Sequence, residues 1–163
     1  RELSGRYDKL VSIEMIEAVG EQFLDGYFAQ CSRLLRPDGL MLLQAITMPD
    51  ARYGRYRRDV DFIQQYIFPG GFLPSVSAIS AALRRGADME IVELWDFAEH
   101  YAQTLHHWRR RFWHHMDDVR LLGFDERFIR MWHYYLCYCE AGFRERMTGV
   151  SHILLAKSAW RSS

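Results

Sequence analysis

The feature that most constrains the fold is a short apolar run, LMLLQAI, at positions 40–46. A run with so little polar alternation is typical of a strand that is covered on both faces. Positions 7–13, YDKLVSI, also have strand character, and the segment between the two carries apolar residues at helical spacing until Pro37 and Gly39 end the helix. Strand, helix and strand in this order form a βαβ unit, which favours a parallel sheet with a right-handed crossover.

The remainder of the chain continues the mixed α/β pattern without internal repeats. The further expected elements are a helix over 57–67, a helix begun by Pro74 and Ser75 that runs to about Arg85, a strand over 89–97, helices over about 98–116 and 125–146, and a final strand from Gly149 onward. A length of 163 residues predicts one domain or a large part of one.

Composition excludes several classes of protein. Hydrophobic residues make up 49% of the chain, and 21 basic residues balance 21 acidic ones, so the charge gives no argument for a nucleic-acid partner. No apolar run approaches the roughly 20 residues that a membrane-spanning helix needs, and the polar start does not resemble a secretory leader. Three cysteines (Cys31, Cys137 and Cys139) form no even disulfide framework, which favours reduced thiols and a cytoplasmic location. The chain begins without Met shortly before its first strand, which indicates a fragment.

Two carboxylates interrupt the apolar segment that ends the first expected strand. Glu14 and Glu17 follow that strand, and Gln44 and Ile46 end the next one. Ligands of open parallel sheets bind beyond the carboxyl ends of the strands, so these groups are expected to face one pocket. A carboxylate there holds a cation, orients a protonated anion or acts as a base. The alternative, that each Glu caps the following turn or reaches solvent, stays open.

Other polar clusters have simpler interpretations. The segments RYGRYRRD (52–59) and HHWRRRFWHH (106–115) suit either a lipid head-group interface or solvated helix faces whose arginine stems cover rings. The four histidines of the second segment lack acidic or thiol ligands at set spacing, so the sequence predicts no metal site. Cys137 and Cys139 lie two apart in a helical pattern, where side chains point apart, and structural thiols are expected there.

The order of the segments adds a family resemblance. The segments that carry it are YDKLVSIEMIEAVG, LLRPDGLMLLQAIT, DFIQQYIFPGGFLPS, HYAQTLHHWRRRF and GFDERFIRMWHYYLCYCEAGFRER. Together they closely resemble cyclopropane-fatty-acyl-phospholipid synthases over essentially the whole chain, with YIFPGGFLPS as a specific signature. The resemblance implies an α/β fold, the C-terminal half of a Rossmann-like class I methyltransferase sheet with inserted lipid-side helices. Residues 1–163 are then a partial methyltransferase domain, and the Gly-rich cofactor loop lies upstream.

The same resemblance implies a chemistry. Family enzymes move a methyl group from S-adenosylmethionine to the cis double bond of a phospholipid acyl chain, and a bound bicarbonate accepts the proton released on ring closure. By resemblance Glu17 helps to hold this ion, Ile46 contributes its backbone and Tyr101 lines the pocket. Cys139 matches a family thiol that the chemistry does not require. The implied partners are unsaturated phospholipid chains at the inner membrane surface, with homo-oligomer formation as a further expectation.

Two positions depart from the family pattern. Many members have His where this chain has Gln44, and a small residue where it has Glu14. Gln still hydrogen-bonds an anion but carries neither proton nor charge. The related activities that remain open are methylation without ring closure and, for the isolated chain, non-catalytic binding of lipid or protein. Phe68, Trp132 and Tyr135 are the rings considered for stabilising positive charge near the substrate.

Overall fold

The computed structural model describes residues 3–161, which form two compact units. The first unit comprises the chain up to Asp96 together with the segment from Val150, and the second comprises Phe97–Gly149. The first contains β1 (Tyr7–Ile13), two short 3₁₀ turns (Ile16–Ala18 and Glu21–Phe23), α1 (Leu24–Leu34), β2 (Leu35–Thr47), α2 (Asp50–Tyr56), a π-helical turn (Ile63–Ile67), α3 (Val76–Gly86), β3 (Met89–Asp96) and β4 (Gly149–Lys157).

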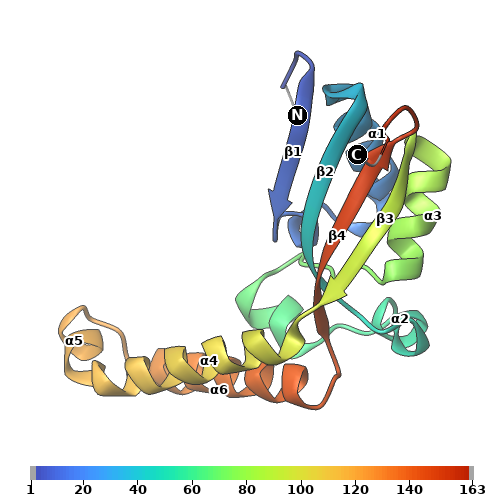
Figure 1. Ribbon diagram of the computed structural model, residues 1–163. Coiled ribbons are helices and arrows are strands. Elements are labelled where there is room, and N and C mark those ends of the chain that lie inside the picture. The colour runs from blue at the N-terminus through green and yellow to red at the C-terminus, as the bar shows by residue number, and fades with distance from the viewer. Residues whose placement is uncertain (1–2, 162–163) are drawn as a thin grey trace. The chain divides into compact units, whose positions relative to one another are not determined.

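The four strands form one sheet in the order β1-β2-β4-β3. β1 and β2 are parallel, β3 and β4 are antiparallel, and Figure 1 shows β4 running against the other three strands. The register of the antiparallel pair sets Asp96 opposite Ser151, so the chain leaves β3 and enters β4 at neighbouring points. The expected βαβ unit and mixed α/β class are confirmed.

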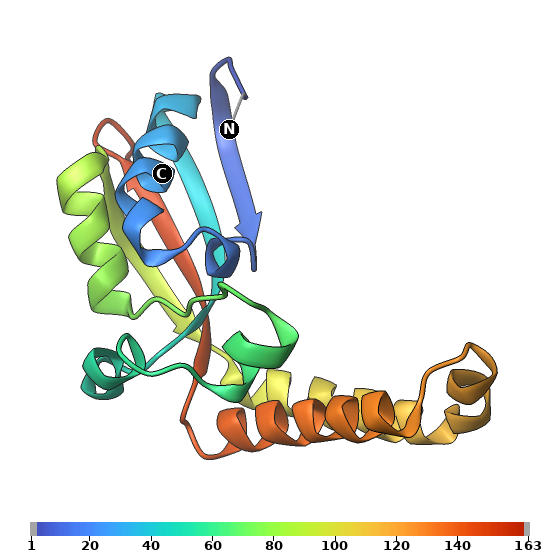
Figure 2. The ribbon, with the colours of Figure 1, turned by 180° about the vertical axis from the view of Figure 1, so that it is seen from behind.

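Helices α1 and α3 lie side by side on one face of the sheet (Figure 2). Their apolar residues pack on alternating side chains of β2 and β4 in a core that includes Phe28, Met41, Leu43, Ile79 and Leu155. Burial of this apolar surface is the main term that stabilises the unit. The strand ends next to the carboxylates are therefore carried by a rigid, packed scaffold.

The second strand begins earlier than expected. β2 starts at Leu35 rather than at residue 40, because Leu35 already pairs with Tyr7, and a register shift then absorbs the RPDG turn before Lys9 pairs with Leu40. A Cβ at Gly39 would approach the carbonyl oxygen of Asp8 to 3.1 Å. Glycine at this position lets the turn lie against β1.

The helix expected over 57–67 is wrong. α2 ends at Tyr56, and only a π-helical turn forms over Ile63–Ile67. The side chains and backbone amides of Asp61 and Gln64 bond reciprocally, which starts a new turn at Asp61 instead of continuing the helix. The helix predicted to begin at Ser75 is confirmed, since its hydroxyl caps α3 by accepting from Ala78 N–H at 3.1 Å.

The second unit is a helical hairpin of α4 (Ala98–His114), α5 (Met116–Leu121) and α6 (Glu126–Arg144) (Figure 1). The two long helices were expected at nearly these bounds, whereas the short α5 between them was not. Asp125 caps α6 by accepting from Phe128 N–H at 2.7 Å. No helix within residues 3–161 is long and apolar enough to cross a membrane.

Candidate functional site at the carboxyl ends of the strands

Three of the predicted site residues meet at the carboxyl end of the parallel strands. Glu17 lies on the 3₁₀ turn after β1, while Gln44 and Ile46 lie at the end of β2. The backbone N–H of Ile46 donates to Glu17 Oε1 at 2.6 Å. The contact that the resemblance implied for Ile46, a backbone contribution, is here made to Glu17 itself.

The second oxygen of Glu17 is the unusual atom of this site. Oε2 is buried, and among the described residues no group lies within hydrogen-bonding distance of it. Burial raises the pKa of Glu17 above the ordinary 4.5, the bond from Ile46 N–H opposes this, and the charge of Glu14 adds to it. The net rise means that this carboxyl group takes up a proton more readily than an exposed glutamate does.

Local packing holds Glu17 in this place. Ile16 is fully buried in the core and anchors the 3₁₀ turn. Glu14 precedes the turn in the left-handed conformation, with φ of 50°, and its N–H donates to the Gln44 carbonyl at 2.9 Å. A non-glycine residue in this region costs about 1–2 kcal/mol, and such strain gathers at functional sites.

The signature loop YIFPGGFLPS closes on both strand ends. Phe72 N–H donates to the Glu17 carbonyl at 2.9 Å, and Met48 N–H donates to the Pro74 carbonyl at 3.0 Å. Gly70 has φ of 82°, and a Cβ at Gly71 would approach the Phe68 carbonyl oxygen to 2.9 Å. The two glycines therefore permit the tight turn that fixes the backbone of Glu17 from behind. The sequence analysis identified this loop as a family signature but did not predict that it contacts the two strand ends.

A chain of polar side chains runs beside Glu17. Gln44 Nε2 donates to Glu14 Oε1 at 2.7 Å, and His152 Nε2 lies 2.8 Å from Gln44 Oε1. His152 belongs to β4, the neighbour of β2, and was missed from the sequence. Its signal was a histidine in a mostly apolar final strand, VSHILLAKS, which also carries Lys157.

The other two predicted site residues belong to the helical unit. Tyr101 of α4 packs against Phe143 of α6, with ring centroids 4.7 Å apart. Cys139 is half-buried in α6, where Trp132 and Tyr135 also pair with centroids 5.0 Å apart. Within the helical unit Tyr101 is therefore part of the packing between the two long helices. Phe68 lies in the first unit, in the signature loop.

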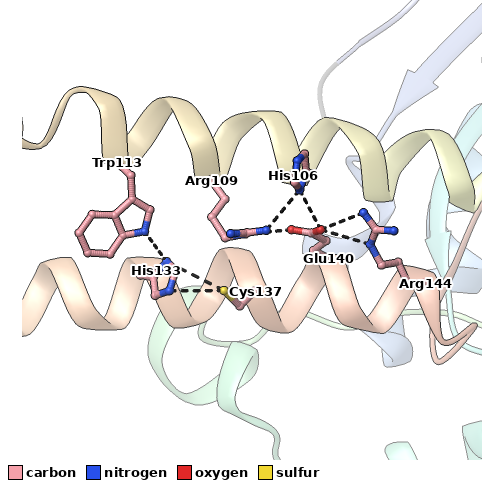
Figure 3. A network of polar contacts seen from close by, with 7 residues as sticks. All are labelled: His106, Arg109, Trp113, His133, Cys137, Glu140 and Arg144. Carbon is pink, nitrogen blue, oxygen red and sulfur yellow. Dashed lines mark hydrogen bonds and ion pairs between the residues drawn. The ribbon is translucent and has the colours of Figure 1, made fainter.

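A buried carboxylate joins the two long helices (Figure 3). Glu140 of α6 is only 8% exposed, and it accepts from Arg109 of α4 at 3.0 Å and from Arg144 at 3.0 Å. His106 Nδ1 lies 3.2 Å from the same carboxylate. Burial raises the pKa of Glu140, but the bonds from the two arginines outweigh it, so the pKa lies below its ordinary value. His106 and Arg109 of the segment HHWRRRFWHH therefore have a structural role, because they bind the carboxylate that joins the two helices.

The same helix pair holds a second polar chain (Figure 3). Trp113 Nε1–H donates to His133 Nδ1 at 2.8 Å, and His133 Nε2 lies 3.6 Å from Cys137 Sγ. The indole N–H occupies Nδ1, so the hydrogen of a neutral His133 ring lies on Nε2.

Cys31, in the first unit, is a buried thiol whose pKa is raised by burial to about 11, which makes it unreactive.

Two arginines of the other arginine-rich segment, Arg55 and Arg57, form ion pairs. Arg57 bonds to Glu21 at 2.5 Å and lies over the Tyr53 ring, 5.7 Å from its centroid, and Arg55 bonds to Asp59. These contacts support the simpler interpretation in which arginine stems cover rings. In the part of the chain that the structure describes, no three His, Cys, Asp or Glu side chains gather as a metal site.

The fold defines the class of protein. The arrangement of strands and helices is that of class I S-adenosylmethionine-dependent methyltransferases. The structure of the mycolic acid cyclopropane synthase CmaA1 complexed with SAH and CTAB matches with a TM-score of 0.84 at 27% identity, over 96% of this chain and 57% of that one. The expected half of a class I sheet is thereby supported as the fold.

The family follows from the sequence comparisons. The family model described as mycolic acid cyclopropane synthetase matches residues 1–153, and the chain belongs to this family. It is 49% identical over 144 residues to the tuberculostearic acid methyltransferase of Mycobacterium tuberculosis, covering 88% of this chain and 34% of that protein. It is 37% identical over 152 residues to the cyclopropane-fatty-acyl-phospholipid synthase of Escherichia coli, covering 90% and 36%. The chain therefore spans about a third of the length of these relatives.

Proposed function

We propose that the protein containing this chain transfers a methyl group from S-adenosylmethionine to the double bond of an unsaturated lipid acyl chain. The observation that carries the proposal is the raised pKa and unpartnered, buried Oε2 of Glu17 at the carboxyl end of the sheet. Such a carboxyl group handles a proton next to a developing charge. Family membership supplies the reaction class in which a proton must leave the methylated chain.

The cofactor supplies an electrophilic methyl group on a sulfonium when it is bound. No residue of this chain is assigned to the cofactor, because the sequence has no Gly-rich loop of the GxGxxG type. The role of this chain in the proposal is to manage the proton released after methyl transfer. Glu17 does this by holding the anion that would take the proton, and its own Oε1 is held by Ile46 N–H at 2.6 Å.

A bicarbonate ion fits the residues at Glu17. Oε2 of Glu17 has no hydrogen-bond partner among residues 3–161, and a carboxyl group that takes up a proton there can donate it to an anion oxygen. The Gln44 amide adds polar character beside Glu14. In the proposal the ion supplies a base that takes the proton from the methylated chain. Tyr101 and Cys139 stay predictions from the resemblance, to be tested by substitution kinetics.

The fate of the proton separates two products. Loss of a proton with closure of a three-membered ring gives the cyclopropane, which is the outcome expected from the resemblance and named for the Escherichia coli relative. Loss of a proton without ring closure leaves a methylated, still unsaturated chain. The 49% identity to a tuberculostearic acid methyltransferase supports this second candidate. Gln44 and Glu14, which depart from the family pattern, lie together at the site that would decide between them.

The test uses the full-length protein with vesicles of unsaturated phospholipid and S-adenosylmethionine. The proposal expects acyl chains heavier by one CH₂, detected by mass spectrometry. Both candidate products gain the same mass, so proton NMR distinguishes ring methylene signals from olefinic ones. Absence of any methylated acyl chain, with cofactor binding intact, would overturn the proposal.

The lipid partner has support in the helical unit. Leu121 and Leu122, at the turn between α5 and α6, are 85% and 77% exposed, and Phe124 beside them is also exposed. Exposed apolar side chains near arginines suit a membrane interface. Flotation of the full-length protein with anionic vesicles tests this peripheral association at the inner membrane surface, and loss of flotation is expected for Leu121→Ser with Leu122→Ser. Flotation unchanged by that pair would contradict the assignment.

For the isolated chain, a binding module is the alternative function. β1 lies at the edge of the sheet and exposes Tyr7, Val11 and Ile13. Exposed apolar edge strands invite pairing with another chain. Size-exclusion chromatography of the isolated chain tests it: concentration-dependent oligomers support pairing through this edge, whereas a monomer at all concentrations rules out self-association.

A further inference from the structure

Three neighbouring strands contribute one continuous chain of polar side chains. His152 comes from β4, Gln44 from β2, and Glu14 from the residue after β1. The joining distances are 2.8 Å from His152 Nε2 to Gln44 Oε1 and 2.7 Å from Gln44 Nε2 to Glu14 Oε1. The Trp95 ring meets the His152 ring edge to face, with centroids 6.0 Å apart, and constrains its plane.

The donors and acceptors of these three side chains are compatible with one hydrogen-bonding order, in which His152 donates to Gln44 and Gln44 donates to Glu14. An ionised carboxylate only accepts, so the Gln44 atom that faces Glu14 must be the amide nitrogen. The amide oxygen then faces His152, and His152 Nε2 must carry a hydrogen in order to donate. A flipped amide would set its oxygen against the Glu14 carboxylate. Donation from His152 therefore selects the amide orientation that holds Glu14.

We propose that His152 is a positioning residue of the strand-end site, which fixes the Gln44 amide so that it holds the Glu14 carboxylate next to Glu17. The expected effect on the reaction rate rests on the proposed function. The hydrogen bonds that join His152, Gln44 and Glu14 do not depend on it. Glu14 is a strained residue, with φ of 50°, whose side chain is restrained by the Gln44 amide. The charge of Glu14 in turn acts on Glu17 and helps to keep the proton there.

The imidazole thereby acts on the site through the amide rather than by touching substrate. The Gln44 side chain carries no charge, and the orientation of its amide is set by the groups to which it hydrogen-bonds. Removal of the His152 donor leaves Gln44 Oε1 without that bond, so the amide is then oriented by its bond to Glu14 alone and is held less firmly. Misplacement of a reacting group by about 1 Å is enough to lower a rate by about 100-fold.

The experiment compares His152→Phe, which removes the donor, with His152→Gln, which keeps an N–H donor, in the full-length protein. His152→Phe is expected to lower kcat by about 10-fold to 100-fold with KM for S-adenosylmethionine unchanged, and His152→Gln to restore most of it. His107→Phe, on the exposed face of α4, is the matched control and keeps the wild-type rate. Thermal unfolding of each variant confirms that it is folded.

A second readout does not depend on activity. In protein labelled with ¹⁵N only at glutamine, the Gln44 side-chain amide signal is identified by its disappearance in Gln44→Leu. We expect this signal to shift in His152→Phe and to stay in place in His152→Gln. An unshifted signal in His152→Phe, or a His152→Gln variant as impaired as His152→Phe, overturns the proposal. Shifted amide signals in a protein that methylates no lipid overturn the proposed function instead and leave the positioning role intact.

Discussion

Glu17 Oε1 accepts a hydrogen bond from the Ile46 backbone N–H at 2.6 Å, which joins the turn after β1 to the end of β2. This one contact leaves Oε2 of the same carboxyl group buried and without a partner among residues 3–161. Burial without a second partner is unfavourable for the charged form. The site therefore keeps a buried carboxyl group with a raised pKa, at some cost in stability when it is ionised.

Glu17→Gln tests this cost and the role together. The Gln amide still accepts from Ile46 N–H but has no titratable carboxyl group to hold the anion, so methyl transfer by the full-length protein is expected to fall by about 100-fold or more. Activity is measured with unsaturated phospholipid vesicles. Glu145→Gln, an exposed acid at the end of α6, serves as the control and retains activity. A wild-type rate in Glu17→Gln would remove this residue from the site.

The raised pKa of Glu17 also predicts that the stability difference between wild type and Glu17→Gln depends on pH. The folded pKa of Glu17 lies above 4.5, so the folded protein binds this proton more tightly than the unfolded chain does. Its contribution to the free energy of unfolding is most favourable at low pH and is lost as the pH rises through the folded pKa. Glu17→Gln should gain stability relative to wild type at about pH 8 and lose that gain at about pH 4. Unfolding curves whose difference is the same at both pH values would contradict the raised pKa.

Glu14→Gly separates strain from function. Glycine adopts the positive φ freely, so relief of about 1 kcal/mol offsets the lost bond to Gln44, and the free energy of unfolding is expected to change by less than about 1 kcal/mol. Activity should change nonetheless, because the charge beside Glu17 is gone. Arg146→Gly, at the other non-glycine position with positive φ, is the matched control and should gain stability with unchanged activity. Unchanged activity in Glu14→Gly as well would assign Glu14 to backbone geometry alone.

Glu140→Gln tests the network between α4 and α6. Gln keeps one acceptor oxygen but removes the charge that Arg109 and Arg144 share, so a loss of about 1–3 kcal/mol in the free energy of unfolding is expected. The folded pKa of Glu140 is lowered, so its contribution is complete above the ordinary value of 4.5 and is lost as the pH falls through the folded pKa. Chemical unfolding at about pH 7 and about pH 3 measures both effects, and wild-type stability in Glu140→Gln would refute the network.

Gly71→Ala tests the signature loop. Its new Cβ would lie 2.9 Å from the Phe68 carbonyl oxygen, so a loss of about 1–3 kcal/mol is expected, with impaired activity because the loop fixes the backbone of Glu17. Gly54→Ala in α2 meets open space and is the control of opposite sign, with a gain of about 0.5–1 kcal/mol. Thermal unfolding of both variants decides the matter. Equal behaviour of the two would mean that the loop tolerates a side chain.

The isolated chain gives a last prediction. Since no Gly-rich phosphate- or cofactor-binding motif occurs in its sequence, calorimetry with S-adenosylmethionine is expected to show little or no binding. Cooperative thermal unfolding of the same sample is the control that the chain is folded. Micromolar affinity would place cofactor contacts within these residues.

Sequence patterns predicted the helices and strands correctly where a local signal, such as an apolar run, an alternation or a helix cap, marks the element. The apolar run at 40–46, the alternation in 89–97 and the Ser75 cap each led to an observed element, because burial and capping are local requirements. The helix expected over 57–67 failed because the pairing of Asp61 with Gln64 restarts the backbone, a choice that helical spacing does not show. The early start of β2 depends on its pairing with β1, which is a property of two segments at once.

The site was predictable only in part, for a similar reason. Carboxylates at a strand end are visible in the sequence, and Glu17 with Ile46 indeed meet there. His152 is separated from Gln44 by 108 positions, so its contact depends on the order in which β2 and β4 pair. Nothing in the local pattern of β4 distinguishes this histidine from one that only fills space.

The cross-strand pairing of Asp96 with Ser151 has a consequence for how such proteins diversify. Everything from Phe97 to Gly149 leaves and rejoins the sheet at a single point, so this stretch is a cassette held between two adjacent strands. Insertions at such places are tolerated because the ends lie close together. Changes in the length or sequence of the helical hairpin are therefore compatible with the pairing of the strands that position Glu17 and Gln44.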